Sequence, residues 1–159
     1  MSELAEAGTV PAADLHQRVG QTFVSHWFVV DQDRIDAFAK VTEDEQFIHV
    51  DPEQARSTPF GGTVAHGFLT LSLLSPMASS ALPKIKGKTI GVNYGFDRVR
   101  FLHPVRSGNR VRGHFVLGDV IRRSEQEWRL SYDVNVEIEG AHKPALAATW
   151  LTMQMVGTD

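Results

Sequence analysis

The sequence of residues 57–83, STPFGGTVAHGFLTLSLLSPMASSALP, contains no Asp, Glu, Lys or Arg. A helix that is apolar nearly all round must be enclosed by the rest of its domain. Because His66, Gly67 and several Ser and Pro residues interrupt the run, it is not the ~20-residue apolar segment that a bilayer crossing needs. Pro76 removes one helical hydrogen bond and predicts a kink. We therefore expect a buried central helix with a sheet wrapped round it.

The segments after this helix alternate as β-strands do. The clearest alternation, over Leu130–Ile138, predicts a strand with one solvated face. Similar patterns predict strands over 90–101, with a bulge at Gly95, and over 111–117, and residues 145–156 predict a more buried last strand. Short turns join these strands, so we expect them to be antiparallel neighbours. The predicted fold class is α+β, one long helix enclosed by an antiparallel sheet.

Length and charge exclude several classes of protein. The 159 residues predict a single domain over 1–159, with residues 1–10 as a loose tail. A net charge of -3 argues against a nucleic-acid partner. Cysteine is absent, and residues 1–6 lack the basic and apolar parts of a secretory signal. We therefore expect a cytoplasmic protein with neither a membrane nor a nucleic-acid partner.

The region before the central helix carries helix-capping signals. A short helix is expected from Pro11 to near Gly20, and a first strand over Thr22–Val30. Asp31 predicts the N-cap of a helix whose buried side carries Ile35, Phe38, Ala39 and Val41. Asp51, followed by Pro52, predicts the cap of another short helix, so we assign Asp51 no chemistry.

Two features indicate chemistry. Asp44 and His49 lie five residues apart beside apolar Phe47 and Ile48, and a partly desolvated carboxylate–imidazole pair suits acid–base catalysis. The alternative is that Asp44 only caps backbone donors. Gly67 opens the central helix, where free N–H groups suit an oxyanion, although a glycine there also permits close packing.

Other kinds of site are disfavoured. We interpret His66 as a structural hydrogen-bonding residue rather than a base. The seven His residues show no HxxH or HxH spacing and there is no Cys, so no metal site is expected. Neither a P-loop nor a dinucleotide-binding GxGxxG is present. The serines of the central helix lack the surroundings of a nucleophile elbow.

The order of motifs resembles that of the MaoC-like dehydratases, which include the (R)-specific enoyl-CoA hydratases, and is most similar to their NodN-like branch. The resemblance covers roughly residues 20 to 155 and rests on Thr42-x-Asp44-x-Gln46-x-Ile48-His49-x-Asp51, Ala55, Phe60-Gly61, Ala65-His66-Gly67-Phe68, Val92-Asn93-Tyr94-Gly95 and Val99-Arg100-Phe101. The family signature is commonly Gly-Asp-x-Asn-Pro-Ile-His. Glu43, Gln46 and Phe47 depart from it, and the change at Glu43 is expected to alter the backbone of the loop.

The resemblance implies a hotdog fold, a homodimer and a hydration reaction. By this resemblance, Asp44 and His49 hold one water and add it to a trans-2-enoyl-CoA, giving an (R)-3-hydroxyacyl-CoA, while the Gly67 N–H receives the thioester oxygen. CoA thioester is then the substrate, and no cofactor or metal is expected. The expected acyl pocket is lined by Phe47, Phe60, Phe68, Leu71 and Met77. The expected contacts to CoA phosphates come from Lys84, Lys86, Arg98, Arg100 and Arg106.

Two other functions remain open. A hotdog thioesterase would hydrolyse acyl-CoA, but such enzymes commonly carry an Asp or Glu on the central helix, and this helix has none. A non-catalytic subunit that binds acyl thioesters is the second alternative, which the intact Asp44 and His49 pair disfavours.

Overall fold

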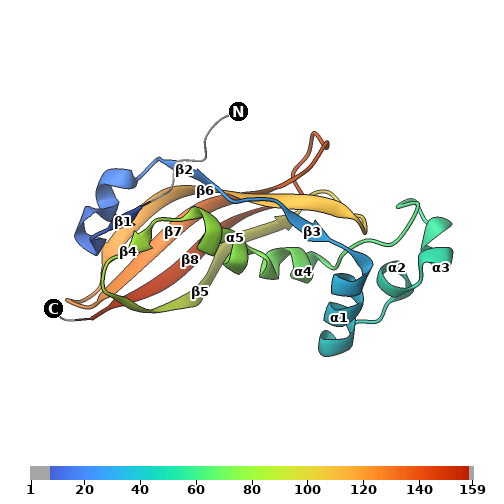
Figure 1. Cartoon of the computed structure of the whole chain (residues 1–159), viewed down its shortest axis with the longest axis horizontal. Helices are drawn as coiled ribbons and strands as arrows, with labels where there is room; N and C mark the ends of the chain where they lie inside the picture. Colours follow the sequence, from blue (N-terminus) through green and yellow to red (C-terminus); the bar gives the residue numbers. More distant parts are fainter. Residues whose placement is uncertain (1–7, 158–159) are drawn as a thin grey trace.

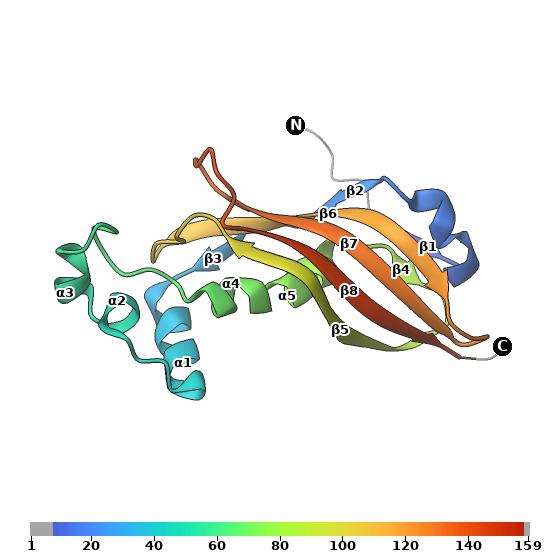
Figure 2. The same cartoon turned by 180° about the vertical axis from the view of Figure 1, so that it is seen from behind.

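The computed structural model describes residues 8–157, and its main layer is an antiparallel sheet curved over one helical segment (Figures 1 and 2). The sheet runs in the order β2-β6-β7-β8-β5, and β3 also pairs with β6. Its strands are β2 (Thr22–Val24), β3 (Phe28–Val30), β5 (Lys88–Phe101), β6 (Asn109–Arg122), β7 (Glu127–Ile138) and β8 (Leu146–Val156). The α+β prediction is confirmed.

The central helix is divided into α4 (Gly67–Ser72) and α5 (Leu74–Ala81), which meet at Leu73. The break lies one turn before Pro76, whose ring would clash with the carbonyl of Ser72 and which has no N–H to donate to it. The irregularity expected from Pro76 is confirmed as this interruption of the helix.

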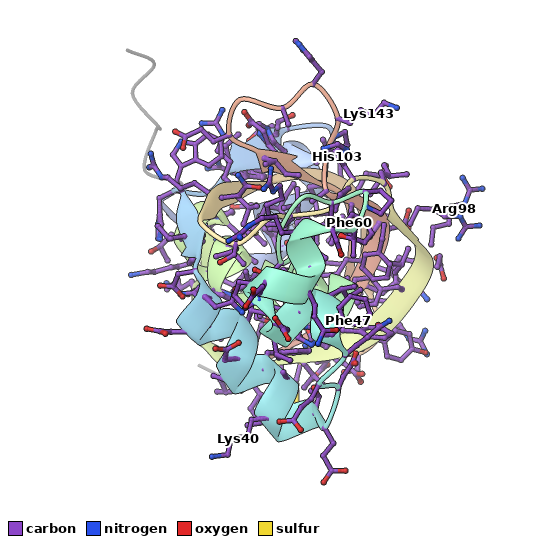
Figure 3. The ribbon with its side chains drawn as sticks, turned by 90° about the vertical axis from the view of Figure 1, so that its right-hand side faces the viewer. Lys40, Phe47, Phe60, Arg98, His103 and Lys143 are labelled. Carbon is purple, nitrogen blue, oxygen red and sulfur yellow. The ribbon has the colours of Figure 1, made fainter. Side chains whose placement is uncertain are left out.

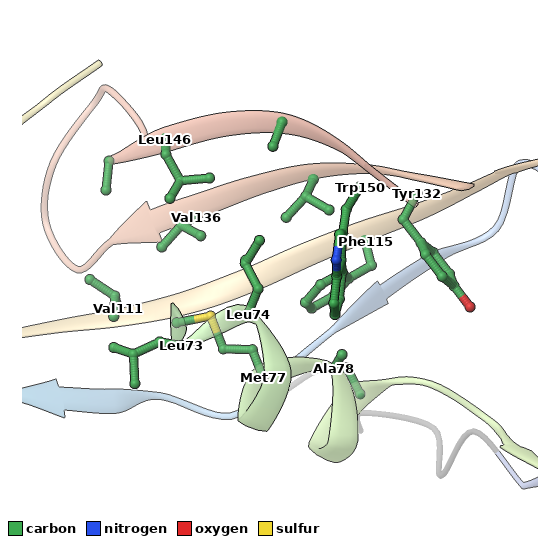
Figure 4. Packing of buried hydrophobic residues seen from close by; sticks show 14 of the residues in the cluster. Leu73, Leu74, Met77, Ala78, Val111, Phe115, Tyr132, Val136, Leu146 and Trp150 are labelled. Carbon is green, nitrogen blue, oxygen red and sulfur yellow. The ribbon is translucent and has the colours of Figure 1, made fainter. Parts of the chain in front are cut away.

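One side of α4 and α5 packs into the sheet. Leu69, Leu74 and Met77 are buried against strand residues such as Val111 and Phe115 (Figure 4). The strand positions predicted to face inward are buried as expected along β6 and β7; they are Val111, Phe115, Leu117, Leu130, Tyr132, Val134, Val136 and Ile138. This alternation places the core on the concave face of the sheet.

The opposite side of the helix is open, so the prediction of an enclosed helix is wrong for the single chain. Phe68 is 66% exposed, and four residues of this side are also exposed, namely Ser72, Ser75, Pro76 and Ser79. A single curved sheet covers one side of a helix only. Because the outward positions carry mostly small hydroxyl side chains, the chain tolerates their exposure.

The pairing of β5 also differs from the prediction. β5 pairs with β8 at the edge of the sheet, with Phe101 opposite Leu146, and has no pairing with β6, the next strand along the chain. The connection over 102–108 therefore crosses from one side of the sheet to the other. The bulge predicted at Gly95 is confirmed, since the register shifts between Asn93 and Gly95.

The N-terminal elements follow the capping signals with several differences. η1 (Ala12–Arg18) is a 3₁₀ helix. The expected strand 22–30 is divided into β2 and β3. Between them, Ser25 N–H still donates to the Gly113 carbonyl, but the Gly113 N–H donates to the Ser25 hydroxyl at 2.9 Å instead of to a backbone carbonyl. Of the expected loose tail, residues 1–7 lie outside the described residues. Thr9–Val10 form β1 beside β4 (Lys84–Ile85), which corrects that part of the prediction.

Three helices lie beyond one end of the sheet (Figures 1 and 2). They are α1 (Gln32–Thr42), α2 (Phe47–Val50) and α3 (Pro52–Arg56). Both predicted caps are confirmed: an Asp31 carboxylate oxygen accepts from Arg34 N–H, and one of Asp51 accepts from Glu53 N–H. Val41 was expected to be buried but is 78% exposed. None of the helices in the described part of the chain is long and apolar enough to span a membrane.

Candidate active site

Asp44 lies in the loop that follows α1. The helix ends at Thr42, and its C-cap residue, Glu43, has φ 60° and ψ 21°. Glu43 is the one non-glycine residue with positive φ in the described part of the chain. The left-handed conformation is the one that glycine favours, and Glu43 stands where the family signature commonly has Gly. Glu43 therefore adopts a backbone conformation that glycine favours, and the expected change of the loop relative to the family stays a prediction.

His49 lies on α2 and is buried. Its Nδ1 donates to the carbonyl oxygen of Val64 at 2.6 Å, because a carbonyl oxygen only accepts. The neutral ring therefore carries its proton on Nδ1 and leaves Nε2 as a base. Burial is the main cause that lowers the pKa of His49. The hydrogen bond to the Val64 carbonyl raises this pKa, the His66 ring lowers it further, and the Asp44 carboxylate raises it.

His66 joins the two predicted catalytic residues. Its ring stacks on that of His49, with centroids 3.7 Å apart and planes at 24°. Its Nε2 donates to the backbone carbonyl of Asp44 at 2.9 Å, so the ring holds the loop in place. Its buried Nδ1 has no hydrogen-bond partner among the described residues. The prediction that His66 forms a structural hydrogen bond is confirmed.

The side chains of Asp44, His49 and His66 converge, with their potential ligand atoms all within 4.8 Å of one another. The stacked rings do not suit a shared metal ion. Because the rings are stacked and inclined by only 24°, their nitrogen lone pairs lie in two nearly parallel, separate planes. One ion cannot then lie in both ring planes at the ~2.0–2.1 Å of a metal–imidazole bond. The arrangement fits acid–base chemistry on a small molecule.

Gly67 begins α4 directly beside this cluster. A Cβ at this position would lie 3.0 Å from the ring of Phe101 on β5, so the close-packing role is real. The Gly67 N–H has no acceptor among the described residues. Both interpretations of Gly67 therefore remain compatible with the structure.

The residues predicted for an acyl pocket are dispersed. Phe47 and Phe60 lie at the end of the molecule that carries α2 and α3 (Figure 3), and Phe68 packs edge to face against Phe101. Leu71 is partly buried, and Met77 is fully buried in the core. None of the five lines the cavity of about 520 Å³ that lies beside α5.

That cavity was missed by sequence reasoning. Its wall includes Trp150, Thr152 and Gln154 of β8 and Ser75 and Ala78 of α5. The signal in the sequence is the pair of polar residues Thr152 and Gln154, two apart in a largely apolar strand, because alternate positions share one face.

The basic residues predicted to contact CoA fall into separate groups. Arg98 and Arg100 are exposed on β5, the strand whose last residue, Phe101, reaches Gly67, and Arg98 projects away from the ribbon (Figure 3). Lys84 and Lys86 lie at the opposite end of the helix, in and beside β4. Arg106 donates to the Gly61 carbonyl at 2.8 Å and so holds the turn before α4.

The chain belongs to the MaoC like domain family, which its sequence matches over residues 14–138. It is 54% identical over 143 residues to nodulation protein N of Rhizobium leguminosarum bv. viciae, covering 89% of each chain. It is 42% identical over 137 residues to 3-hydroxyacyl-thioester dehydratase Z of Mycobacterium tuberculosis, covering 86% of this chain and 88% of the relative.

Solved structures show the same fold. The R-hydratase PhaJ1 from Pseudomonas aeruginosa superposes with a TM-score of 0.70 at 23% identity, covering 94% of this chain and 87% of that structure. The fold is the hotdog fold, as the resemblance implied.

Proposed function

We propose that this protein is a hydro-lyase that reversibly adds water to a trans-2-enoyl-CoA, giving an (R)-3-hydroxyacyl-CoA. The observation that carries the proposal is the convergence of the Asp44 carboxylate with a buried, neutral His49 whose Nε2 is free. The dehydratase name of the Mycobacterium tuberculosis relative supports the same class of reaction.

His49 supplies the base. Its Nε2 takes a proton from a water that also donates to the Asp44 carboxylate, and the water oxygen bonds to the β-carbon. The carbon–carbon double bond opens toward the α-carbon, which receives a proton back from the pair. The two residues end in the state in which they began, and the substrate gains one water. Because the Val64 carbonyl oxygen accepts the Nδ1 proton, with 2.6 Å between nitrogen and oxygen, the tautomer that can act as base is fixed before substrate binds.

The thioester oxygen becomes negatively charged in the transition state. The Gly67 N–H at the start of α4 is the donor proposed to stabilise that charge. A backbone donor held in a helix needs no reorganisation during the reaction. Gly67 also allows Phe101 to approach closely, so an acyl group would lie between an N–H donor and an aromatic wall.

The rest of the substrate would follow the helix and β5. The cavity beside α5 provides room for an acyl chain beyond the reacting carbons. Arg98 and Arg100 are the basic residues nearest in sequence to Phe101, so they are the proposed contacts for CoA phosphates. Lys84 and Lys86 are less suitable, because they lie at the far end of the helix from the catalytic pair.

A second copy of this chain is the proposed cover for the open side of the helix. The neighbouring edge strand β5 exposes Ile90, Val92 and Tyr94, and the exposed Phe68 lies on α4. Exposed apolar groups beside an unpaired strand edge are the features of an interface. A homodimer would bury them.

The thioesterase alternative has no support from the geometry. Neither α4 nor α5 contains an Asp or Glu that would activate water there.

The test is to mix the protein with crotonyl-CoA and follow the absorbance of the enoyl thioester, with a thiol reagent in a parallel cuvette. The proposal predicts absorbance loss without thiol release, and (R)-3-hydroxybutyryl-CoA as product. Thiol release at the same rate would identify a thioesterase instead. Binding of enoyl thioesters without turnover at any chain length would identify a non-catalytic subunit.

A further inference from the structure

Gln32, the first residue of α1, connects three segments around the catalytic pair. Its Nε2 donates to the backbone carbonyl of His49 on α2 at 2.7 Å and to an Asp36 carboxylate oxygen at 2.8 Å. Its Oε1 accepts from the hydroxyl of Thr63, in the segment before α4, at 2.6 Å. Two of these bonds reach across 17 and 31 positions of the chain, so they join elements that are distant in the sequence.

The partners of the Gln32 amide determine its orientation. A backbone carbonyl and an ionised carboxylate only accept, so the group between them is the NH₂, and its two hydrogens serve the two acceptors. The hydroxyl of Thr63 then donates to Oε1. Thr63 is 5% exposed, so its hydroxyl is withdrawn from water and depends on this bond. The amide and the hydroxyl therefore use all their hydrogens within the protein.

These bonds form a closed ring of contacts that includes His49 twice. Gln32 binds the backbone carbonyl of His49 and, through Oε1, the hydroxyl of Thr63. The next residue, Val64, accepts from His49 Nδ1 at 2.6 Å and donates its N–H to the Ile48 carbonyl at 3.0 Å. The backbone of His49 and the segment that holds its ring are therefore joined by one side chain.

The position of α2 depends on such contacts with other elements. The helix has four residues and no side-chain cap, and helices this short are not stable by themselves. α1 and α2 lie side by side at the end of the sheet (Figures 1 and 2), and Gln32 provides a hydrogen bond between them. Loss of this bond would therefore allow α2, and His49 with it, to move.

We propose that Gln32 is a positioning residue, which holds the ring of His49 in the orientation that directs Nε2 at the reacting water. This inference rests on the proposed hydro-lyase function. Gln32 does not line the cavity beside α5, so it acts on the base rather than on the acyl chain. The Val64 carbonyl selects the tautomer of His49, and Gln32 keeps that carbonyl within reach of Nδ1.

The first test is kinetic, with crotonyl-CoA as substrate. Gln32→Leu keeps a similar size without the amide and should lower kcat by about 10- to 100-fold, because a small misplacement of a catalytic group has an effect of this order. KM should stay close to that of wild type. Thr63→Val, which replaces the hydroxyl by a methyl group, should also lower kcat. The double variant should be about as slow as Gln32→Leu, because both changes break the same chain of bonds.

Gln54→Leu is the matched control for the loss of an amide. Gln54 lies on α3, close in sequence to His49, and its side chain is exposed. We expect this variant to keep the kcat of wild type.

The second test observes the ring of His49 directly. In ¹⁵N-labelled protein at about pH 8, where imidazole is neutral, the nitrogen chemical shifts show which ring nitrogen carries the proton. The signals of His49 are those missing from His49→Gln. Wild type and Gln54→Leu should show the Nδ1–H tautomer alone. Gln32→Leu and Thr63→Val should show a mixture with the Nε2–H tautomer.

Wild-type kcat in a folded Gln32→Leu would overturn the inference. So would a loss of activity with His49 still entirely in the Nδ1–H form, because that loss would not come from the ring. If Gln32→Leu does not fold, Thr63→Val breaks the same chain of bonds and decides the question by the same two measurements.

Failure of the hydratase proposal is recognised separately, by the absence of enoyl-thioester turnover in wild type. In that event the tautomer of His49 decides alone. Mixed tautomers in Gln32→Leu and Thr63→Val would support the positioning role, and an unchanged Nδ1–H form in both would refute it.

Discussion

Two contacts fix the ring of His49, a hydrogen bond at its edge and a stacked ring on one face. The Val64 carbonyl binds Nδ1 at 2.6 Å, and the His66 ring covers one face at 3.7 Å. A backbone hydrogen bond also connects the two segments, since Val64 N–H donates to the Ile48 carbonyl at 3.0 Å. A base with one tautomer and one orientation loses little freedom on reaching the transition state. His66 contributes through position, because it fixes both the ring of His49 and the backbone of Asp44.

The buried state of His49 predicts a pH dependence of stability. Its pKa is lowered in the folded protein, so the unfolded chain binds the proton first as pH falls below about 6.5. Stability from this residue is therefore fully present above pH 6.5 and declines as pH falls toward the folded pKa. Urea unfolding of wild type and His49→Gln between pH 5 and 8 should show a shallower acid decline in the variant. Parallel curves would contradict the lowered pKa.

Glu43 holds a backbone conformation that costs most residues energy. A left-handed conformation costs a non-glycine residue roughly 1–2 kcal/mol. Replacement by glycine removes this cost, but the greater freedom of glycine in the unfolded chain cancels part of the stability gained. We expect Glu43→Gly to raise the free energy of unfolding by about 1 kcal/mol and Glu43→Val to lower it. Thermal unfolding measures both. A loss of stability in Glu43→Gly would mean that the Glu side chain stabilises the loop in a way the backbone does not explain.

At the scale of single elements, α4 carries the most demanding contact. Gly67 leaves space for Phe101, and the same residue is the proposed oxyanion donor. These roles involve different atoms, the missing side chain for packing and the backbone N–H for catalysis. They can therefore be separated by mutation.

Gly67→Ala should lower turnover of crotonyl-CoA by about 10- to 100-fold, because the new Cβ must displace Phe101 or the start of the helix. Adding Phe101→Ala removes the clash and leaves the N–H in place. The double variant should recover most of the activity of Phe101→Ala alone. If the double variant stays as slow as Gly67→Ala, the loss does not come from the contact with Phe101.

Local signals predicted elements well and distant pairings poorly. The caps at Asp31 and Asp51 and the bulge at Gly95 follow from residue chemistry within a few positions. The four residues of α2 have no side-chain cap, so no local signal marked them. The partner of β5 depends on a connection that crosses the sheet, and strand alternation contains no information about it.

The residues around the candidate site also fall into two groups, those that a local motif predicts and those that only the folded sheet brings together. Asp44 and His49 were identified because a motif brought them together, and the structure places their side chains in one cluster. The cavity residues Trp150 and Gln154 come from a strand whose apolar pattern marks it as core. Only the folded sheet brings that strand opposite α5.

In the molecule as a whole, one side of the helix and the β5 edge of the sheet have no partner among the described residues. We expect a solution mass of twice 17.6 kDa, measured by light scattering. Because Ile90 and Val92 are exposed on β5, Ile90→Lys with Val92→Lys should shift the protein toward monomer. Val41→Lys, at an exposed apolar position on α1, is the matched control and should stay dimeric. A monomeric wild type would contradict the proposed interface.

Asp44 is proposed to act with His49 in hydration, and the most direct measurement makes the same Asp→Asn substitution at two positions. Asp44→Asn should lower crotonyl-CoA hydration by ~10²–10⁴-fold. Asp51→Asn, at the cap of α3 where asparagine serves as well as aspartate, should leave it near wild type. Circular dichroism of both variants checks that each is folded. Near-full activity in a folded Asp44→Asn, or an equal loss in both variants, would contradict a catalytic role for Asp44.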